Sequence, residues 1–280
     1  MTLQSLKPPL LIRTLQTGLC ILTASLGLAT VASGSKFMEK SFPVSAGGSL
    51  TLICESGDII VEGSSRDDIR LVILSSQDLE KNFSFAFKQD GNALRILSAR
   101  KSGEYKAGRY NLGMQFKLSV PDKLNLELET SSGHIAVSAL ECPSDSLPLK
   151  AKATGGEIRL EQVRARAVIK AVGGDIRVKG LTGPISAETS GGEMQVELAE
   201  SPRVECSLLT GGGNISFSLP SASDADFTVE TSGGAVTSGP PLELIAEPGS
   251  PVFTGRLGEG GVKIGLKAAG GKIQIKPYQQ

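Results

Sequence analysis

Polar and apolar residues alternate with a period of two after a recurring pair of glycines. Four such segments read GEIRLE, GDIRVK, GEMQVE and GNISFS. This alternation predicts β-strands with one buried face. We expect their first apolar residues to form one buried file, consisting of Ile158, Ile176, Met194 and Ile215.

The residues before each glycine pair alternate in the same way, so each repeat predicts two strands joined by a tight glycine turn. Inward columns are expected at Ile185, Ala187 and Thr189, at Val204, Cys206, Leu208 and Thr210, and at Phe227, Val229 and Thr231. Glycine suits such a corner because it tolerates positive φ and allows stacked backbones to approach closely.

The last glycine of each corner gives the length of the repeat. These corner residues are Gly133, Gly156, Gly174, Gly192, Gly213, Gly234 and Gly271, at intervals of 23, 18, 18, 21, 21 and 37. A drifting period near 20 is typical of a solenoid. The last interval has room for two units or for one unit with an insertion.

The predicted fold is therefore all-β, a parallel β-solenoid (β-helix or β-roll-like) of two-strand coils with Gly-Gly corners. One coil cannot bury enough surface alone, so each is expected to stack on the next along the chain. An antiparallel sandwich or barrel would also show short alternating strands. The fixed phase of the corner at every second strand favours the parallel stack.

Three regions follow from the pattern. Residues 131–280 hold the repeats, and residues 36–130 form an N-terminal β region, interpreted as a cap or first coils. That region contains one outlying corner at Gly57 and a hairpin signal at Asp90 and Gly91.

Residues 1–33 predict a signal peptide, since two basic residues precede an apolar run that ends on small residues. An uncleaved membrane anchor is the alternative, although the run is short for a spanning helix. Export would place the protein in the periplasm, on the cell surface or outside the cell.

Composition removes several classes of function. The 29 basic and 29 acidic residues balance, so no nucleic-acid partner is expected. A single histidine and the lack of a C-x-x-C motif predict neither a metal site nor a cofactor. Cys54 and Cys206 lie in phase with apolar neighbours and are expected to be buried thiols, while the pairing of Cys142 stays open.

The first outward position after successive corners forms a surface ladder of His134, Glu157, Asp175 and Glu193. Its carboxylates could bind a cation or act as an acid pair on a glycan. The alternative is a solvated face whose charge is balanced by Arg159 and Arg177. Candidate contact residues for a partner on the outer strand faces are Arg159, Arg177, Lys170 and Glu188.

Several ordered motifs resemble a bacterial envelope family of β-strand-repeat proteins labelled putative adhesin, a domain of unknown function. They are FPVSAGGSLTLICESGDIIVEG, FKLSVPDKLNLELETSSGHIAV, the serial T-S-G-G-x-I-x-V rungs and GEGGVKIGLKAAGGKIQIK. The resemblance covers about residues 40–277 and implies architecture more than activity. It carries over no catalytic or ligand residues.

Together these features predict an exported, non-enzymatic envelope or surface protein whose rigid solenoid mediates binding or adhesion. Its partner would be an envelope or surface protein or a glycan, with membrane contact only through an uncleaved N-terminal segment. A polysaccharide-acting enzyme and an envelope-stress or signalling accessory protein are the alternatives.

Overall fold

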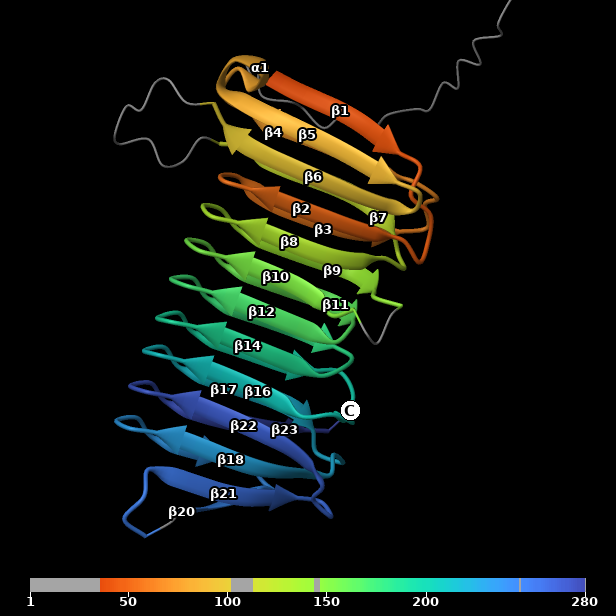
Figure 1. The fold of residues 1–280 in the computed structure, drawn as a ribbon. Coiled ribbons are helices and arrows are strands. Elements are labelled where there is room, and N and C mark those ends of the chain that lie inside the picture. The colour runs from red at the N-terminus through yellow and green to blue at the C-terminus, as the bar shows by residue number, and fades with distance from the viewer. Residues whose placement is uncertain (1–35, 102–112, 144–146, 247, 280) are drawn as a thin grey trace, which may run out of the picture. The chain divides into compact units, whose positions relative to one another are not determined.

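A computed structural model describes residues 36–101, 113–143, 147–246 and 248–279 (Figure 1). The predicted signal peptide lies outside these residues. No helix in the described part of the chain has the length and apolar character needed to cross a membrane.

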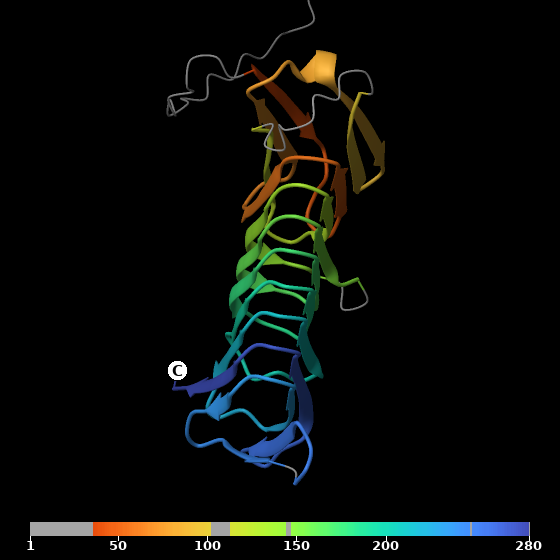
Figure 2. The ribbon, with the colours of Figure 1, turned by 90° about the vertical axis from the view of Figure 1, so that its left-hand side faces the viewer.

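Two β-sheets, here called sheet A and sheet B, run alongside each other and enclose the core (Figure 2). Sheet A has 11 strands, in the spatial order β1 (Lys36–Phe42), β4 (Ile69–Ser75), β7 (Gln115–Pro121), β3 (Asp58–Ser64), β9 (Ile135–Glu141), β11 (Ile158–Arg164), β13 (Ile176–Leu181), β15 (Met194–Leu198), β17 (Ile215–Pro220), β23 (Ile273–Tyr278) and β19 (Val236–Ser238). Sheet B has 12 strands, in the order β20 (Glu243–Ala246), β21 (Val252–Leu257), β18 (Ala225–Thr231), β22 (Val262–Ala268), β16 (Cys206–Thr210), β14 (Ile185–Thr189), β12 (Ala167–Ala171), β10 (Leu149–Ala153), β8 (Asn125–Thr130), β2 (Ser49–Cys54), β6 (Ala93–Arg100) and β5 (Phe83–Asp90).

Each coil contributes one strand to each sheet, and equivalent strands of stacked coils pair in parallel. Ile158 pairs with Ile176, Ile176 with Met194 and Met194 with Ile215. All four side chains are buried. The predicted β-solenoid and its buried file are confirmed.

Alternation places every second side chain between the sheets. The Phe217 ring of β17 and the Phe227 ring of β18 meet edge to face, with centroids 6.5 Å apart. Burial of these apolar files is the main stabilising term, and each coil depends on its neighbours to cover its own file.

Both ends of the stack depart from parallel pairing. At one end β1 pairs antiparallel with β4 and β5 pairs antiparallel with β6, next to the short helix α1 (Leu79–Asn82). The β5–β6 pair contains the predicted hairpin at Asp90 and Gly91, where Gly91 has φ of 54°. At the other end β21 and β20 form an antiparallel extension of β18.

The coils do not stack strictly in chain order, which corrects the sequence prediction. The last coil, β22 and β23, lies between the coil of β16 and β17 and the coil of β18 and β19. The long interval before Gly271 therefore holds one insertion, the β20–β21 pair. At the other end the coil of β6 and β7 lies outside that of β2 and β3.

Val204 is a second correction. The alternation predicts it in the inward column of β16, but it precedes that strand and its side chain is 53% exposed. The connection from β15 to β16 is longer than its neighbours, and this extra length carries Val204 out of the pleat.

Candidate functional site

The predicted corner glycines stack directly on one another, and they form the row of narrow turns along the left of Figure 1. A Cβ atom on Gly174 would lie 1.9 Å from the carbonyl oxygen of Gly156, and one on Gly192 would lie 2.0 Å from that of Gly174. Among the seven corners of the repeat region only Gly133 has positive φ, at 149°, and the outlying corner Gly57 has φ of 126°. Close backbone approach, rather than the expected left-handed conformation, is thus the general reason for glycine here.

Buried threonine hydroxyls link the corners of neighbouring coils through hydrogen bonds. The Thr210 hydroxyl accepts a hydrogen bond from Gly213 N at 3.0 Å and donates one to the Gly192 carbonyl at 3.0 Å. Thr189 makes the equivalent pair of bonds with Gly192 and Gly174. The T-x-G-G motif therefore couples neighbouring coils, because each hydroxyl satisfies a buried backbone group in both.

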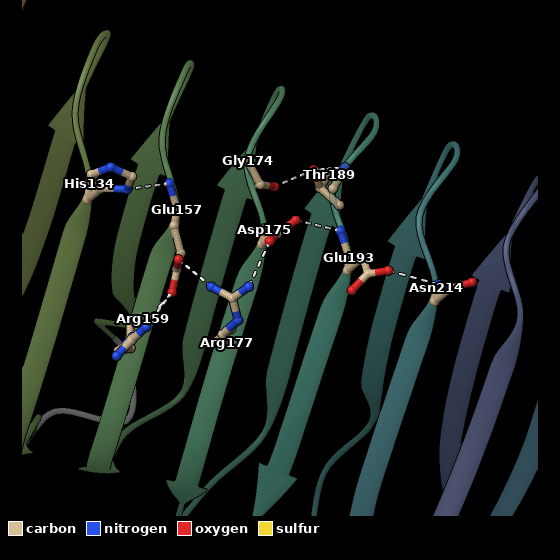
Figure 3. A network of polar contacts seen from close by, with 10 residues as sticks. His134, Glu157, Arg159, Gly174, Asp175, Arg177, Thr189, Glu193 and Asn214 are labelled. Atoms are coloured by element: carbon tan, nitrogen blue, oxygen red, sulfur yellow. Dashed lines mark hydrogen bonds and ion pairs between the residues drawn. The ribbon is translucent and has the colours of Figure 1, made fainter. Parts of the chain in front are cut away.

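The surface ladder lies just outside the glycine corners, with side chains directed along the stack (Figure 3). In most rungs a side chain accepts a hydrogen bond from the backbone N–H of the next coil. These bonds run from His134 N to Asp58 Oδ1 (3.0 Å), from Glu157 N to His134 Nδ1 (3.0 Å), from Glu193 N to Asp175 Oδ1 (2.9 Å) and from Lys272 N to Asn214 Oδ1 (2.9 Å). The ladder side chains thus accept hydrogen bonds from backbone N–H groups just before the strands of sheet A.

Two arginines form ion pairs with two of the ladder carboxylates, Glu157 and Asp175. Arg159 lies 3.0 Å from Glu157, and Arg177 binds both Glu157 and, at 2.9 Å, Asp175 (Figure 3). Partial burial raises the pKa of the Glu157 carboxyl, but hydrogen bonds from Arg177 and Arg159 outweigh this effect and leave its pKa below the usual range. The structure places the ladder residues on successive coils, and two of its three carboxylates, those of Glu157 and Asp175, are paired with arginine.

Glu157 is poorly suited to act as a general acid on a glycan. A general acid at neutral pH needs a raised pKa, whereas the pKa of Glu157 is lowered. Within the described residues, no three His, Cys, Asp or Glu side chains converge as a metal site would require.

The three cysteines that the structure describes are buried thiols, as expected for Cys54 and Cys206, and Cys142 is also free. Burial raises the pKa of Cys54 and of Cys142 to about 11. Both thiols are therefore protonated at neutral pH and are poor nucleophiles.

The other contact candidates lie on the opposite face of the molecule. Lys170 of β12 and Glu188 of β14 form an ion pair of 3.4 Å on the outer face of sheet B. Arg159 and Arg177 instead border a shallow hollow of about 430 Å³ on the outer face of sheet A. The four residues thus belong to two separate surfaces.

The sequence analysis missed a larger hollow, which we name the corner trough, at the turns opposite the glycine corners. Residues 142–143 after β9 and the longer connection 199–205 lie on either side of the short turns 165–166 and 182–184. The hollow has a volume of about 660 Å³, and its lining includes Arg164, Arg166, Pro184, Glu200, Arg203 and Val204. The repeat intervals contain the signal, since the long connections fall in the intervals of 23 and 21 residues and the short turns in those of 18.

Comparison with known proteins identifies a family match. The family described as Toastrack DUF4097 matches residues 117–276. No curated protein matches the chain.

Solved structures of similar proteins come from bacteria. A putative cell adhesion protein from Clostridium sporogenes is 14% identical, with 87% of this chain and 100% of that chain covered at a TM-score of 0.36. A putative adhesin from Bacteroides fragilis is 14% identical, with coverage of 87% and 97% and a TM-score of 0.41. A putative lipid binding protein from Parabacteroides distasonis is 15% identical, with coverage of 85% and 96% and a TM-score of 0.36.

Proposed function

We propose a function from the premise that this chain belongs to the Toastrack DUF4097 family. The protein is an exported, non-enzymatic component of the cell envelope or surface. Its β-solenoid presents a rigid surface that binds another surface component, either a protein or a glycan.

One observation carries this proposal: successive coils hold their outward side chains at fixed spacing on two extended sheet faces. Parallel strands place equivalent side chains about 4.8 Å apart. Lys152 is paired with Glu129 at 2.6 Å and Lys267 with Glu230 at 2.7 Å on sheet B. Such preorganised side chains lose little conformational entropy on binding, which favours a binding surface.

A polysaccharide-acting enzyme is the rival from another class. It would use the surface ladder, where Glu157 and Asp175 are already bound to arginines. The test is glycan turnover by Glu157→Gln and Asp175→Asn variants that remain folded at the assay temperature, as judged by circular dichroism. Turnover by the wild type that these variants lose would overturn the binding proposal.

The proposal itself is tested in the native cell. Fractionation should recover the protein from the envelope or the medium, and pulldown with the full chain should capture a surface component. Recovery of the chain in the cytoplasm alone, or capture of no envelope component, would contradict it. A partner drawn only from an envelope-stress pathway would favour the signalling alternative.

A further inference from the structure

We propose that two copies of the chain associate end to end through strand β20, so that sheet B continues from one copy into the other. In this dimer β20 of one copy lies antiparallel to β20 of the second copy. The inference goes beyond the proposed function, because it concerns the free end of the stack and not the ligand of the sheet faces.

Strand β20 is a free edge of sheet B at the end of the stack (Figure 1). It pairs with β21 on one side. Within the described residues, Glu243–Ala246 form no hydrogen bond besides those to β21. A strand presents backbone donors and acceptors on both sides, so the outer side of β20 can pair with another strand.

The other three sheet edges carry features that discourage such pairing. They are Glu39 and Lys40 on β1, Lys88 and Asp90 on β5, and a length of only three residues for β19. Charged side chains and short strands are common protections of natural edges. By contrast, β20 has one charged residue, Glu243, at its start and ends on three apolar residues. Ile245 among them is 70% exposed, more than any other large apolar side chain in the described chain.

The sequence of β20 fits a copy of itself. Pro241 and Pro248 lack a backbone N–H and confine pairing to the residues between them. Antiparallel neighbours that lie directly opposite share a face of the sheet, and Leu244 packs against the core whereas Ile245 is exposed. A two-fold axis at Leu244 keeps these faces matched and pairs all of residues 242–246. Each Glu243 then lies opposite Ile245 of the other copy, so no two carboxylates in this segment oppose each other.

The interface is small, so the dimer is expected to be weak. Pairing along residues 242–246 buries less than the about 1,200 Å² of a stable interface, and we expect a dissociation constant of about 10–100 µM. The dimer still bears on binding, because the two stacks extend away from the shared edge. It presents each sheet face twice, and bivalent contact strengthens attachment to a surface without any new contact.

The test is sedimentation velocity of the full chain at about 1–500 µM, a range that spans the expected dissociation constant. Ile245→Glu places a carboxylate opposite Glu243 of the other copy in two symmetric pairs and should weaken the dimer about tenfold, or by about 1.4 kcal/mol. Ile245→Lys removes the same apolar side chain but places an ammonium group there, and should keep or raise the affinity. The matched control is Leu209→Glu, at an exposed position of β16 in the same sheet, which should change nothing.

Several results would overturn the inference. A wild-type chain that stays monomeric over the whole range would end it, as would a dimer that Ile245→Glu and Leu209→Glu weaken equally. Equal losses in Ile245→Glu and Ile245→Lys would also contradict it, because the two charges must differ if Glu243 lies across from position 245. A monomeric wild type whose captured envelope protein is lost in Ile245→Glu would replace the second copy by a strand of that protein. Unchanged far-ultraviolet circular dichroism in all variants shows that the changes act on association and not on folding.

Discussion

The stacked corners make a sharp prediction for two adjacent glycines. Gly192→Ala would place a methyl group 2.0 Å from the carbonyl oxygen of Gly174 and 2.5 Å from its carbonyl carbon. Gly191→Ala meets nothing within 4 Å, and Gly191 is not among the residues with positive φ. The two variants add the same atom to the same turn, so they differ only in what that atom contacts.

The expected cost follows from the geometry. An ordinary contact of about 3.5 Å requires the two coils to separate by about 1.5 Å at the corner, because both contacting groups are backbone and cannot rotate away. Overpacking costs about 1–3 kcal/mol. Separation would also weaken the 3.0 Å hydrogen bond from the Thr189 hydroxyl to the Gly174 carbonyl, which adds about 1–3 kcal/mol for the groups left unpaired. We expect Gly192→Ala to lose about 3 kcal/mol or more.

The assay is urea unfolding followed by far-ultraviolet circular dichroism, with both variants beside the wild type. Gly191→Ala should match the wild type or gain about 0.4–1 kcal/mol, since alanine restricts the unfolded chain. Gly213→Ala, whose methyl would lie 1.9 Å from the Gly192 oxygen, should repeat the loss, and Gly212→Ala should be mild. Equal midpoints for Gly192→Ala and Gly191→Ala would refute the close-approach explanation.

Three further variants test other parts of the stack. Thr210→Val keeps the buried shape but removes both hydrogen bonds of the hydroxyl. The free energy of unfolding should therefore fall by about 1–3 kcal/mol for each group left unpaired. The control Thr228→Val, at an exposed position, should shift the urea midpoint little. Glu157→Gln should lower the free energy of unfolding at neutral pH, because the pKa of Glu157 is lowered in the folded state. The stability that this carboxylate contributes is fully present above its unfolded pKa of about 4.3 and is lost as the pH falls through its folded pKa. A loss that persists in acid below both values would contradict this origin. Gln162→Gly should raise the melting temperature through a gain of about 1 kcal/mol, because Gln162 has φ of 53°; a lower melting temperature would show that its left-handed conformation is not strained.

The structure of a single coil could be predicted from sequence because the patterns that determine it are local. Period-two alternation fixes which side chains face inward, and the glycine phase fixes where each coil turns. These two patterns are enough to assign Ile158, Ile176, Met194 and Ile215 to one file, and the strands pair these residues in register.

The order in which the coils stack could not be predicted in the same way. Cys206 of β16 pairs with Ile264 of β22, and Phe227 of β18 pairs with the same Ile264 from the other side. All coils present similar apolar files and similar corners, so a direct pairing of β16 with β18 would look equally favourable from the pattern. Register is encoded in each coil, while the choice of neighbour depends on contacts across the whole end of the stack.

The corner trough was missed for a related reason. The alternation describes strands, and the trough consists of what lies between them. Val204 continues the alternation of β16 in the sequence, yet the connection at 199–205 bends away from the sheet before the strand begins. The candidate site therefore depends on loop length, which hydrophobic periodicity does not measure.

The position of the final coil bears on how the protein is made. Synthesis proceeds from the N-terminus toward the C-terminus, yet the slot beside β16 and β17 is filled by residues 262–278, which follow β18 to β21 in the sequence. A nascent chain can assemble its earlier coils first, but β18 lacks its parallel partner until β22 has been synthesised. A chain that stops before β22 would lack the coil that pairs with β16 and β17 and the strand on which β18 docks. Quality-control proteases could therefore distinguish it from a chain that contains this coil.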